Sequence, residues 1–416
     1  MKKKIVIIGG GIIGCLTAIY LKQNNHDVTI IEKGSNLGGI LSDHKYQNQI
    51  YLKGTQYLDA DTEWFKILIN LVNDIKVFEY NYGSFTNFGN SKIESSDYAL
   101  PVFDLKIDKK EYFKSTDKTV SLENRINLYP KKISASLKKF FLNGNINSNE
   151  ISSICSGNLG VSRIGFRLNN QNLKMLKKEN KSIDALFAIK RDEMYKNKLQ
   201  YALPSNGYSE FFNKLEEKLK KLEIKIEKNS RIFPEWQNGK FEILLNKKKV
   251  ENDHIFWSGN PTDLIKKFLK KDLDSFVFRT LQVNADILDN SPIKEKFFQV
   301  YSEYSKIFRI NLYNIRNVPK IGIECFFDKY EMKEILDEAQ KILSNFGIKI
   351  NFQLKSINKN LISRFDIITI KDKQLIEEFL EKTKKTNLLF SPWTTYGRSE
   401  KLIKIKENLK YKNLIN

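Results

Sequence analysis

Cysteine and histidine are both scarce in this chain, with three residues of each among 416. The cysteines, Cys15, Cys155 and Cys325, lie far apart and form no CxxC pair. The histidines are scattered as well, so no group of residues has metal-ligand spacing. These absences argue against a disulfide-stabilised secreted domain and against a structural metal site. We therefore expect a cytoplasmic protein without bound metal.

Long hydrophobic runs are missing too. Beyond the N-terminus, no stretch approaches the roughly 20 uninterrupted apolar residues that a transmembrane helix needs. The one apolar run, Ile5 to Leu21, follows three lysines and resembles a secretory signal with a lipoprotein cleavage site before Cys15. Three consecutive glycines interrupt this run, and cleavage would destroy a complete binding motif, so we reject the signal interpretation. Peripheral contact with a membrane stays open.

Acidic residues are too few to balance the basic ones, and the formal net charge is +21. Lysine supplies most of this charge, dispersed along a chain also rich in Asn and Ile, which is typical of an AT-rich coding bias. An anionic small substrate and attraction to an acidic membrane surface are the functional alternatives. No module that combines basic and aromatic residues is recognisable, so nucleic-acid binding is not expected.

The N-terminal segment carries the most informative pattern, KIVIIGGGIIGCLTAIYLKQNNHDVTIIEKG, which begins at Lys4. It predicts a strand, a glycine turn, a helix and a second strand that ends in Glu32. Gly9 permits the tight turn, Gly11 allows the backbone to approach a pyrophosphate, and Gly14 allows the helix to pack on the sheet. The positive end of the helix attracts phosphate, and the carboxylate about 20 residues on can accept hydrogen bonds from a ribose. This order predicts a dinucleotide-binding unit.

The rest of the chain alternates helical and extended patterns. Helices are predicted over 61–75, 208–222, 331–346 and from 400 onwards, and buried strands over 254–257 and 387–390. The polar interval 143–160 predicts a loop, for which a surface excursion and a mobile lid are the alternatives. The chain length and these alternating patterns predict an α/β protein of two domains.

Four segments together carry a family resemblance. They are the fingerprint, the Gly38-Gly39 doublet, the segment LPSNGY from Leu203 with its helix and a strand over 230–232, and the YGRS turn at 396–399. This combination resembles FAD-dependent oxidoreductases of the amine oxidase and protoporphyrinogen oxidase type, a superfamily that includes UDP-galactopyranose mutases and phytoene desaturases. The resemblance implies a Rossmann-like FAD-binding domain, a parallel sheet in ββα layers, with an inserted α+β substrate domain on a mixed or antiparallel sheet.

The resemblance also divides the chain and assigns residues to the cofactor. The FAD-binding domain is expected over 1–75, 200–262 and 385–416, and the substrate-binding domain over 76–199 and 263–384. The glycine doublet favours FAD over NAD, because an extended flavin nucleotide needs a second close backbone approach. The residues expected at FAD are Gly9, Gly11, Ile12, Ile13, Gly14, Glu32, Lys33, Gly38, Gly39, Ile40, Arg231, Ile232, Gly397, Arg398 and Ser399.

Two features of this sequence differ from the family pattern. Ile40 follows the doublet where an arginine is frequent, and no glycine follows the last strand until Gly397. The helix after Gly397 is expected to direct its N-terminus at the flavin N1–C2=O edge, where it would stabilise the negative charge of the reduced ring. An ordinary turn before a helix is the alternative.

A predicted strand supplies the main candidates for substrate binding. Arg309, Asn311 and Tyr313 share one of its faces, and apolar side chains occupy the other. A buried polar face with an arginine would suit an anionic group, whereas a solvent-facing strand is the alternative. The candidates for the catalytic site are Arg309, Tyr313, Trp393 and Tyr396, and Arg364 is a further candidate.

The expected function is transfer of a hydride from a small metabolite, with an anionic one as an alternative, to non-covalently bound FAD. No second GxGxxG motif marks an NAD(P)H domain, so the electrons would come from the substrate or from a separately bound donor. One alternative is a non-redox flavoenzyme similar to UDP-galactopyranose mutase, in which arginines clamp a diphosphate. Another is a flavin-binding protein without chemistry. The sequence does not indicate the oligomeric state.

Overall fold

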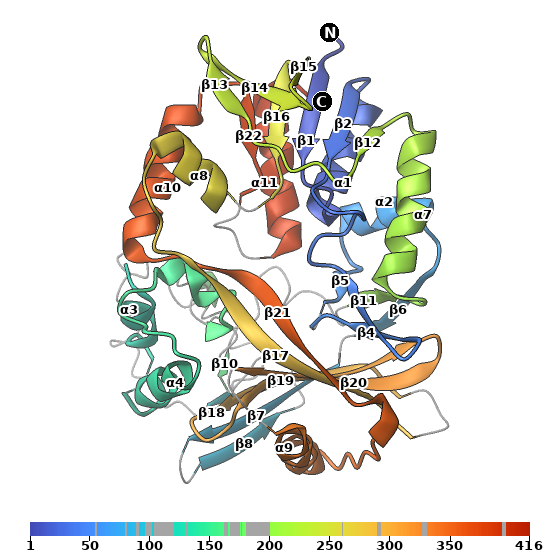
Figure 1. Cartoon of the computed structure of the whole chain (residues 1–416). Helices are drawn as coiled ribbons and strands as arrows, with labels where there is room; N and C mark the ends of the chain where they lie inside the picture. The colour runs from blue at the N-terminus through green and yellow to red at the C-terminus, as the bar shows by residue number, and fades with distance from the viewer. Residues whose placement is uncertain are drawn as a thin grey trace.

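The computed structural model describes residues 1–54, 56–79, 81–88, 91–95, 102–103, 120–129, 131–161, 165–166, 175, 177–179, 200–259, 261–288, 293–326, 331–392 and 397–416. Two main sheets lie at opposite ends of the molecule, and smaller groups of strands connect them (Figure 1). Both chain termini lie at the outer end of the parallel sheet (Figure 1).

The first sheet is parallel and has five strands in the order β12-β2-β1-β16-β22. The strands are β1 (Lys4–Ile8), β2 (Asp27–Ile31), β12 (Lys225–Glu227), β16 (His254–Trp257) and β22 (Leu388–Phe390). They come from three distant parts of the chain. Parallel strands need long crossover connections. Here the connections from β2 to β12 and from β16 to β22 include the strands of the second sheet.

Successive side chains of β1 point to opposite faces of this sheet, and a different layer covers each face. Ile5 and Ile7 pack with the helices α1 (Ile12–Gln23), α2 (Glu63–Leu71), α7 (Tyr208–Lys221) and α11 (Arg398–Tyr411). Val6 and Ile8 pack on the opposite face with β14 of an antiparallel three-stranded sheet and with the helices α8 (Thr262–Leu269) and α10 (Ile370–Thr383). That small sheet consists of β13 (Glu235–Gln237), β14 (Lys240–Leu245) and β15 (Lys248–Val250). The predicted ββα layering is confirmed.

The second sheet has seven strands in the order β21-β17-β20-β19-β18-β7-β8. Its strands are β7 (Tyr82–Phe88), β8 (Ser91–Ser95), β17 (Phe276–Asp286), β18 (Lys296–Ser302), β19 (Ile307–Ile315), β20 (Val318–Phe326) and β21 (Asn358–Ile367). Among the described residues only the β18–β7 pairing is parallel, so of the mixed and antiparallel alternatives that the resemblance implies, this sheet is the mixed one. One face packs its apolar side chains against α9 (Met332–Ser344). The other face is largely polar.

Short elements occupy the space beside and between the two sheets. Between the two main sheets lie the hairpin β3 (Asp43–Tyr46)–β4 (Gln49–Leu52) and the sheet β5-β11-β6 (Leu58–Asp59, Gln200–Pro204 and Ile75–Glu79) (Figure 1). Beside the larger sheet lie α3 (Leu122–Ile126), α4 (Lys131–Asn143), the 3-10 turns η2 (Ser153–Ser156) and η5 (Leu354–Ser356), and the pair β9–β10 (Val102–Phe103 and Gly165–Phe166).

The structure corrects three details of the sequence interpretation. The strand after α7 is Lys225–Glu227, and residues 230–232 lie in the loop that follows it. Helix α10, which the sequence placed in the substrate-binding segments, packs Ile376 and Phe379 against the parallel sheet. The loop 143–160 is not a surface excursion, because it buries Ile146 and Ile151 in a core. The domain boundaries themselves stay a prediction.

Among the residues that the structure describes, no helix combines the length and the apolar character that crossing a bilayer requires. The same residues bring together no group of three or more His, Cys, Asp or Glu side chains that could hold a metal ion.

Candidate nucleotide-binding site and the adjoining polar wall

The first glycine turn connects β1 to α1 and has the geometry that its sequence predicts. The backbone N–H of Gly9 donates to the carbonyl oxygen of Ile31 at 2.9 Å, and Gly9 has a φ of +107°. A Cβ at Gly14 would lie 2.0 Å from the carbonyl oxygen of Gly9, so only glycine allows α1 to start this close to the strand. The side chain of Ile12 is buried and that of Ile13 is half-buried, so any contact of these two residues with a ligand would involve their backbone.

Helix α1 begins without a side-chain cap. Its N-cap is Gly11, and no acidic residue stands in its first turn. The first N–H groups of an α-helix have no partner within the helix and carry partial positive charge, so they bind anions. Among the described residues, the atom that a Cβ at Gly11 would approach most closely is the carbonyl oxygen of Gly38, at 3.9 Å. A methyl group at this position would therefore touch only this carbonyl in the described part of the fold.

Glu32 closes the turn from the end of β2. One carboxylate oxygen accepts from the N–H of Gly10 at 2.7 Å, and the other accepts from the N–H of Gly34 at 2.7 Å. The residue is only 7% exposed. Each carboxylate oxygen has two lone pairs, so this arrangement can still accept hydrogen bonds from ribose hydroxyls. The neighbouring Lys33 is exposed.

We expect Glu32→Gln to lower the free energy of unfolding by about 1–3 kcal/mol, because the amide leaves one buried backbone N–H without an acceptor. Chemical denaturation of the cofactor-free protein measures this effect. Glu217→Gln, at an exposed position on α7, is the matched control and should leave the unfolding midpoint unchanged. Equal midpoints for the two variants would contradict the role assigned to Glu32.

A second glycine turn packs directly on the first. The N–H of Gly38 donates to the carbonyl oxygen of Gly10 at 2.9 Å, and Gly38 forms an isolated parallel bridge with Gly11. A Cβ at Gly38 would meet the carbonyl oxygen of Leu41 at 2.7 Å, and Gly39 has a φ of +60°. The two turns, which the sequence treats as separate signals, form one glycine-lined surface beside the N-terminus of α1. Ile40 is exposed next to it.

The loop after β12 lies along the same edge. The N–H of Asn229 donates to the carbonyl oxygen of Gly34, and the N–H of Ser230 donates to that of Glu32. Arg231 is exposed and Ile232 is half-buried immediately beyond these contacts. Although this segment is not a strand, its backbone runs beside the end of β2, where the adenosine end of a dinucleotide would be expected.

Helix α11 also begins without a side-chain cap, at Gly397 with a φ of +85°. A Cβ there would meet no atom of the described residues within 4 Å. The side chains of the next two residues bind protein atoms: Nη1 of Arg398 donates to the carbonyl oxygen of Tyr57 at 2.6 Å, and Oγ of Ser399 donates to Asp59 at 3.0 Å. These contacts hold segment 57–59 against the start of α11. Trp393 and Tyr396 lie outside the described residues.

The polar face of the seven-stranded sheet contains the predicted substrate residues. Arg309, Asn311 and Tyr313 share a face of β19 and are all buried, which rules out the solvent-facing alternative. The hydroxyl of Tyr57 donates to Oδ1 of Asn311, so segment 57–59 connects α11 to this face. We call the buried face formed by β17, β19 and β20 the polar wall. Its polar residues are Gln282, Asn284, Asp286, Arg309, Asn311, Tyr313, Lys320 and Glu324.

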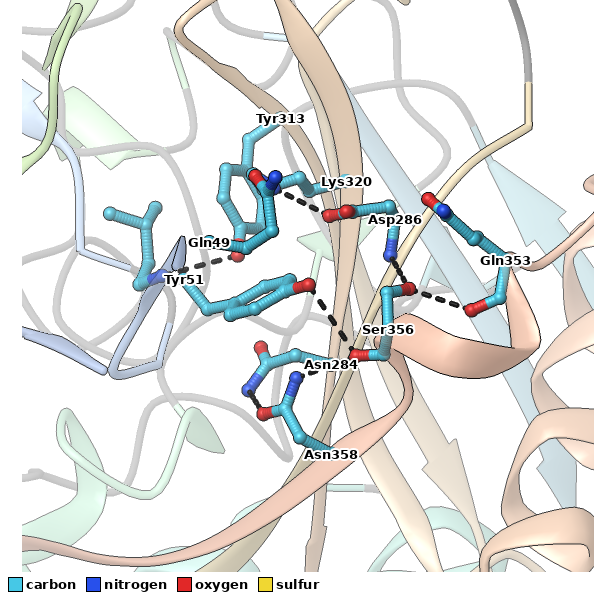
Figure 2. A network of polar contacts seen from close by, with 10 residues as sticks. Gln49, Tyr51, Asn284, Asp286, Tyr313, Lys320, Gln353, Ser356 and Asn358 are labelled. Atoms are coloured by element: carbon cyan, nitrogen blue, oxygen red, sulfur yellow. Dashed lines mark hydrogen bonds and ion pairs between the residues drawn. The ribbon is translucent and has the colours of Figure 1, made fainter. Parts of the chain in front are cut away.

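One end of the polar wall is closed by contacts with the hairpin β3–β4 (Figure 2). Lys320 is 1% exposed and forms an ion pair with Asp286. Its Nζ lies 4.4 Å from the ring centroid of Tyr51. The N–H of Leu52 donates to the hydroxyl of Tyr313 at 3.1 Å. Tyr313, a catalytic candidate in the sequence, thus orients the hairpin. Burial raises the pKa of this phenol well above its usual range, so it remains protonated.

The sequence interpretation missed the ion pair of Lys320 and Asp286. A signal was present in the alternation of β20, where Lys320, Gly322 and Glu324 share the face opposite to Ile321 and Ile323. The same reasoning as for β19 would have placed Lys320 and Glu324 on the polar wall, although not the pairing of Lys320 with Asp286 of β17.

Comparisons with known proteins agree with this geometry. Residues 7–71 match the family described as NAD(P)-binding Rossmann-like domain. Over 72 residues the chain is 35% identical to cinnamate reductase from Clostridium sporogenes, covering 15% of this chain and 11% of that protein. An oxidoreductase from Saccharomyces cerevisiae is 44% identical over 62 residues. The chain spans only 11% and 12% of the length of these two curated relatives.

Solved structures extend the similarity to the whole fold. A protein from Exiguobacterium sp. 255-15, assigned as a protoporphyrinogen oxidase, aligns with a TM-score of 0.61 at 14% identity, over 100% of this chain and 99% of that one. Reduced UDP-galactopyranose mutase aligns with a TM-score of 0.66 at 12% identity, over 99% and 96% of the two chains. The chain therefore has the fold of these two solved structures, and its residues 7–71 match a Rossmann-like family.

Proposed function

We propose that the chain is an FAD-dependent oxidoreductase that transfers a hydride from a small, anionic metabolite to non-covalently bound FAD. The observation that carries this proposal is the pairing of the two glycine turns. Gly38 lies against Gly10 and Gly11, so two backbone segments without side chains adjoin the N-terminus of α1. In the flavoprotein family that the sequence resembles, the second glycine turn lies along the pyrophosphate and ribityl chain of FAD.

The residues present fit FAD along its whole length. Glu32 and the loop that contains Arg231 would hold the adenosine end, and the two glycine turns with the start of α1 would hold the pyrophosphate. The uncapped start of α11 at Gly397 would face the flavin ring. FAD, when bound, supplies hydride acceptance at the ring. Each of these individual roles stays a prediction, as does a cytoplasmic location.

The protein's own residues would bind and orient the substrate beside that ring. Segment 57–59 contacts both the start of α11, through Arg398, and the polar wall, through Asn311. A substrate between the ring and the wall would therefore lie among buried polar groups, which exclude water and fix its orientation. Arg309 supplies positive charge on the wall, which suits an anionic substrate.

A second candidate is a non-redox mutase that acts on a UDP-sugar. The observation in its favour is that Arg309 and Arg364 approach the same carboxylate, Glu324, because two guanidinium groups can clamp a diphosphate. Under the leading proposal, the substrate itself reduces the cofactor. Under the mutase alternative, only previously reduced protein is active and no net oxidation occurs.

Anaerobic mixing of the flavin-loaded protein with a panel of amines, amino acids and hydroxy acids separates the two candidates. The oxidoreductase proposal predicts that at least one compound bleaches the flavin absorption in a single turnover. Conversion of UDP-galactopyranose only after dithionite reduction, with no compound bleaching the flavin, would overturn it in favour of the mutase.

A further inference from the structure

Two of the three histidines in the chain lie together at the end of the parallel sheet where both termini are found (Figure 1). His26 comes immediately before β2 and is 5% exposed, and His254 is the first residue of β16. The two rings are close enough that a positive charge on His26 would lower the pKa of His254. The end of α11 packs at the same place, because Leu414, just after this helix, shares a core with α1 and β2.

The hydrogen bonds of His26 define the protonation state of its ring. The backbone N–H of Lys3 donates to Nδ1 at 3.2 Å. On the other side of the ring, Nε2 lies 2.6 Å from the carbonyl oxygen of Leu414. A backbone N–H can only donate and a carbonyl oxygen can only accept, so Nδ1 has a free lone pair and Nε2 carries the proton. Only the neutral imidazole with its proton on Nε2 satisfies both contacts.

The carbonyl oxygen that His26 binds belongs to the turn that ends α11. Asn413 has a φ of +55°, and its N–H and that of Leu414 donate to carbonyl oxygens of the last helical turn at 2.9 Å each. Leu414 is 2% exposed. We call residues 412–416 the closing segment. Through its two ring nitrogens, His26 thus ties the closing segment to the backbone of Lys3 at the start of β1.

A second proton on His26 would disrupt this connection. It would place an N–H at Nδ1 directly opposite the N–H of Lys3, so that two donors face each other and a hydrogen bond is lost. Lys3 is held in place, because its carbonyl oxygen accepts from the N–H of Asp27 at 2.9 Å. The imidazole ring would therefore have to move, together with the closing segment that its Nε2 binds.

Neighbouring charges also oppose protonation at this place. Burial and, after it, the charges of Lys412 and Lys3 lower the pKa of His254, and Asp253 acts in the opposite direction. A histidine that the fold keeps neutral destabilises the folded state as the pH falls below about 6.5, where the unfolded chain takes up the proton. This end of the sheet is therefore stable at neutral pH and weakened in mild acid. Other charged groups at this end form ion pairs, namely Lys2 with Asp27, Lys4 with Glu251 and Lys22 with Glu223.

We propose that His26 is a pH-sensitive latch, which holds the closing segment against the start of β1 in neutral solution and releases it in mildly acidic solution. Protonation of Nδ1 is the trigger, because it replaces an acceptor by a donor opposite a backbone N–H that is held in the sheet. None of these residues is assigned to the cofactor or the substrate, so the latch is independent of the proposed function.

Hydrogen–deuterium exchange of the intact protein tests the latch. Exchange at residues 409–416 would be measured by mass spectrometry at about pH 7.5 and about pH 5.5, on either side of the range in which histidine titrates. Each rate is divided by the intrinsic exchange rate at that pH. Protection of this segment is expected to fall about tenfold or more at the lower pH, while β1 and β2 keep theirs. Equal protection of the segment at both pH values would overturn the proposal.

Variants assign the effect to His26. In His26→Gln, the amide can donate to the carbonyl oxygen of Leu414 but takes up no proton, so protection of the closing segment should no longer change with pH, whether the segment is held or open. His44→Gln, the same substitution on β3, is the control and should keep the full loss in acid. Thermal unfolding at neutral pH confirms that each variant is folded. If His26→Gln loses protection in acid as strongly as wild type, or if only His254→Gln abolishes the loss, His26 is not the sensor.

Discussion

Gly11→Ala is expected to weaken FAD binding by about 5- to 150-fold while the cofactor-free protein keeps its stability. The added methyl would occupy the space beside the N-terminus of α1, and overfilling a close contact costs about 1–3 kcal/mol. In the absence of ligand this methyl has ordinary room, because its nearest neighbour among the described residues lies 3.9 Å away and Gly11 has a φ of −69°. Titration of cofactor-free protein with FAD, together with thermal unfolding, measures both quantities.

Gly14→Ala provides the contrasting control. Its Cβ would lie 2.0 Å from the carbonyl oxygen of Gly9, so the helix itself must shift and the cofactor-free protein should lose stability. The two substitutions add the same methyl three residues apart, but only Gly11→Ala should separate binding from folding. Unchanged FAD affinity in Gly11→Ala would show that the pyrophosphate does not approach this turn.

Lys320→Met is expected to lower the free energy of unfolding by about 3–5 kcal/mol, because it leaves the carboxylate of Asp286 buried without its counter-ion. Lys320 is 1% exposed, and its ammonium group also contacts the ring of Tyr51. The variant should also loosen the hairpin β3–β4, since Tyr51 belongs to β4. Urea denaturation of wild type and variant gives the difference.

The double variant Lys320→Met/Asp286→Leu isolates the charge effect. With both charges removed, apolar groups of similar size occupy the site, so most of the lost stability should return. If Lys320→Met alone were as stable as wild type, the ion pair would contribute nothing to the free energy of unfolding. The packing of the hairpin on the sheet would then depend on other contacts. If the double variant were no better than the single one, packing rather than charge would explain the loss.

Local chemistry made the nucleotide-binding unit predictable. Gly14 is required by its close contact with Gly9, five residues earlier, and Glu32 binds the N–H groups of Gly10 and Gly34 in the turns beside it. Such short-range requirements leave a clear pattern in the sequence. Alternation likewise placed Arg309 and Tyr313 correctly on one face of β19.

Features that depend on pairing between distant strands were not predictable. Arg364 reaches Glu324 only because a register shift redirects it, and no residue pattern around 364 announces that bulge. The pairing of Lys320 with Asp286 depends on β17 and β20 being neighbours in the sheet. Helix α10 follows a strand of the large sheet in sequence but packs on the parallel one, so its position could not be inferred from sequence order.

The measurement that tests the central claim most directly is identification of the nucleotide that wild-type protein binds. The purified protein, and the same protein incubated with FAD and passed through a desalting column, would be examined by absorption spectroscopy and by mass spectrometry of the heat-released nucleotide. We expect a flavin spectrum and one equivalent of FAD released without covalent attachment. A colourless protein that retains no FAD after incubation, or that retains only NAD, would contradict the account.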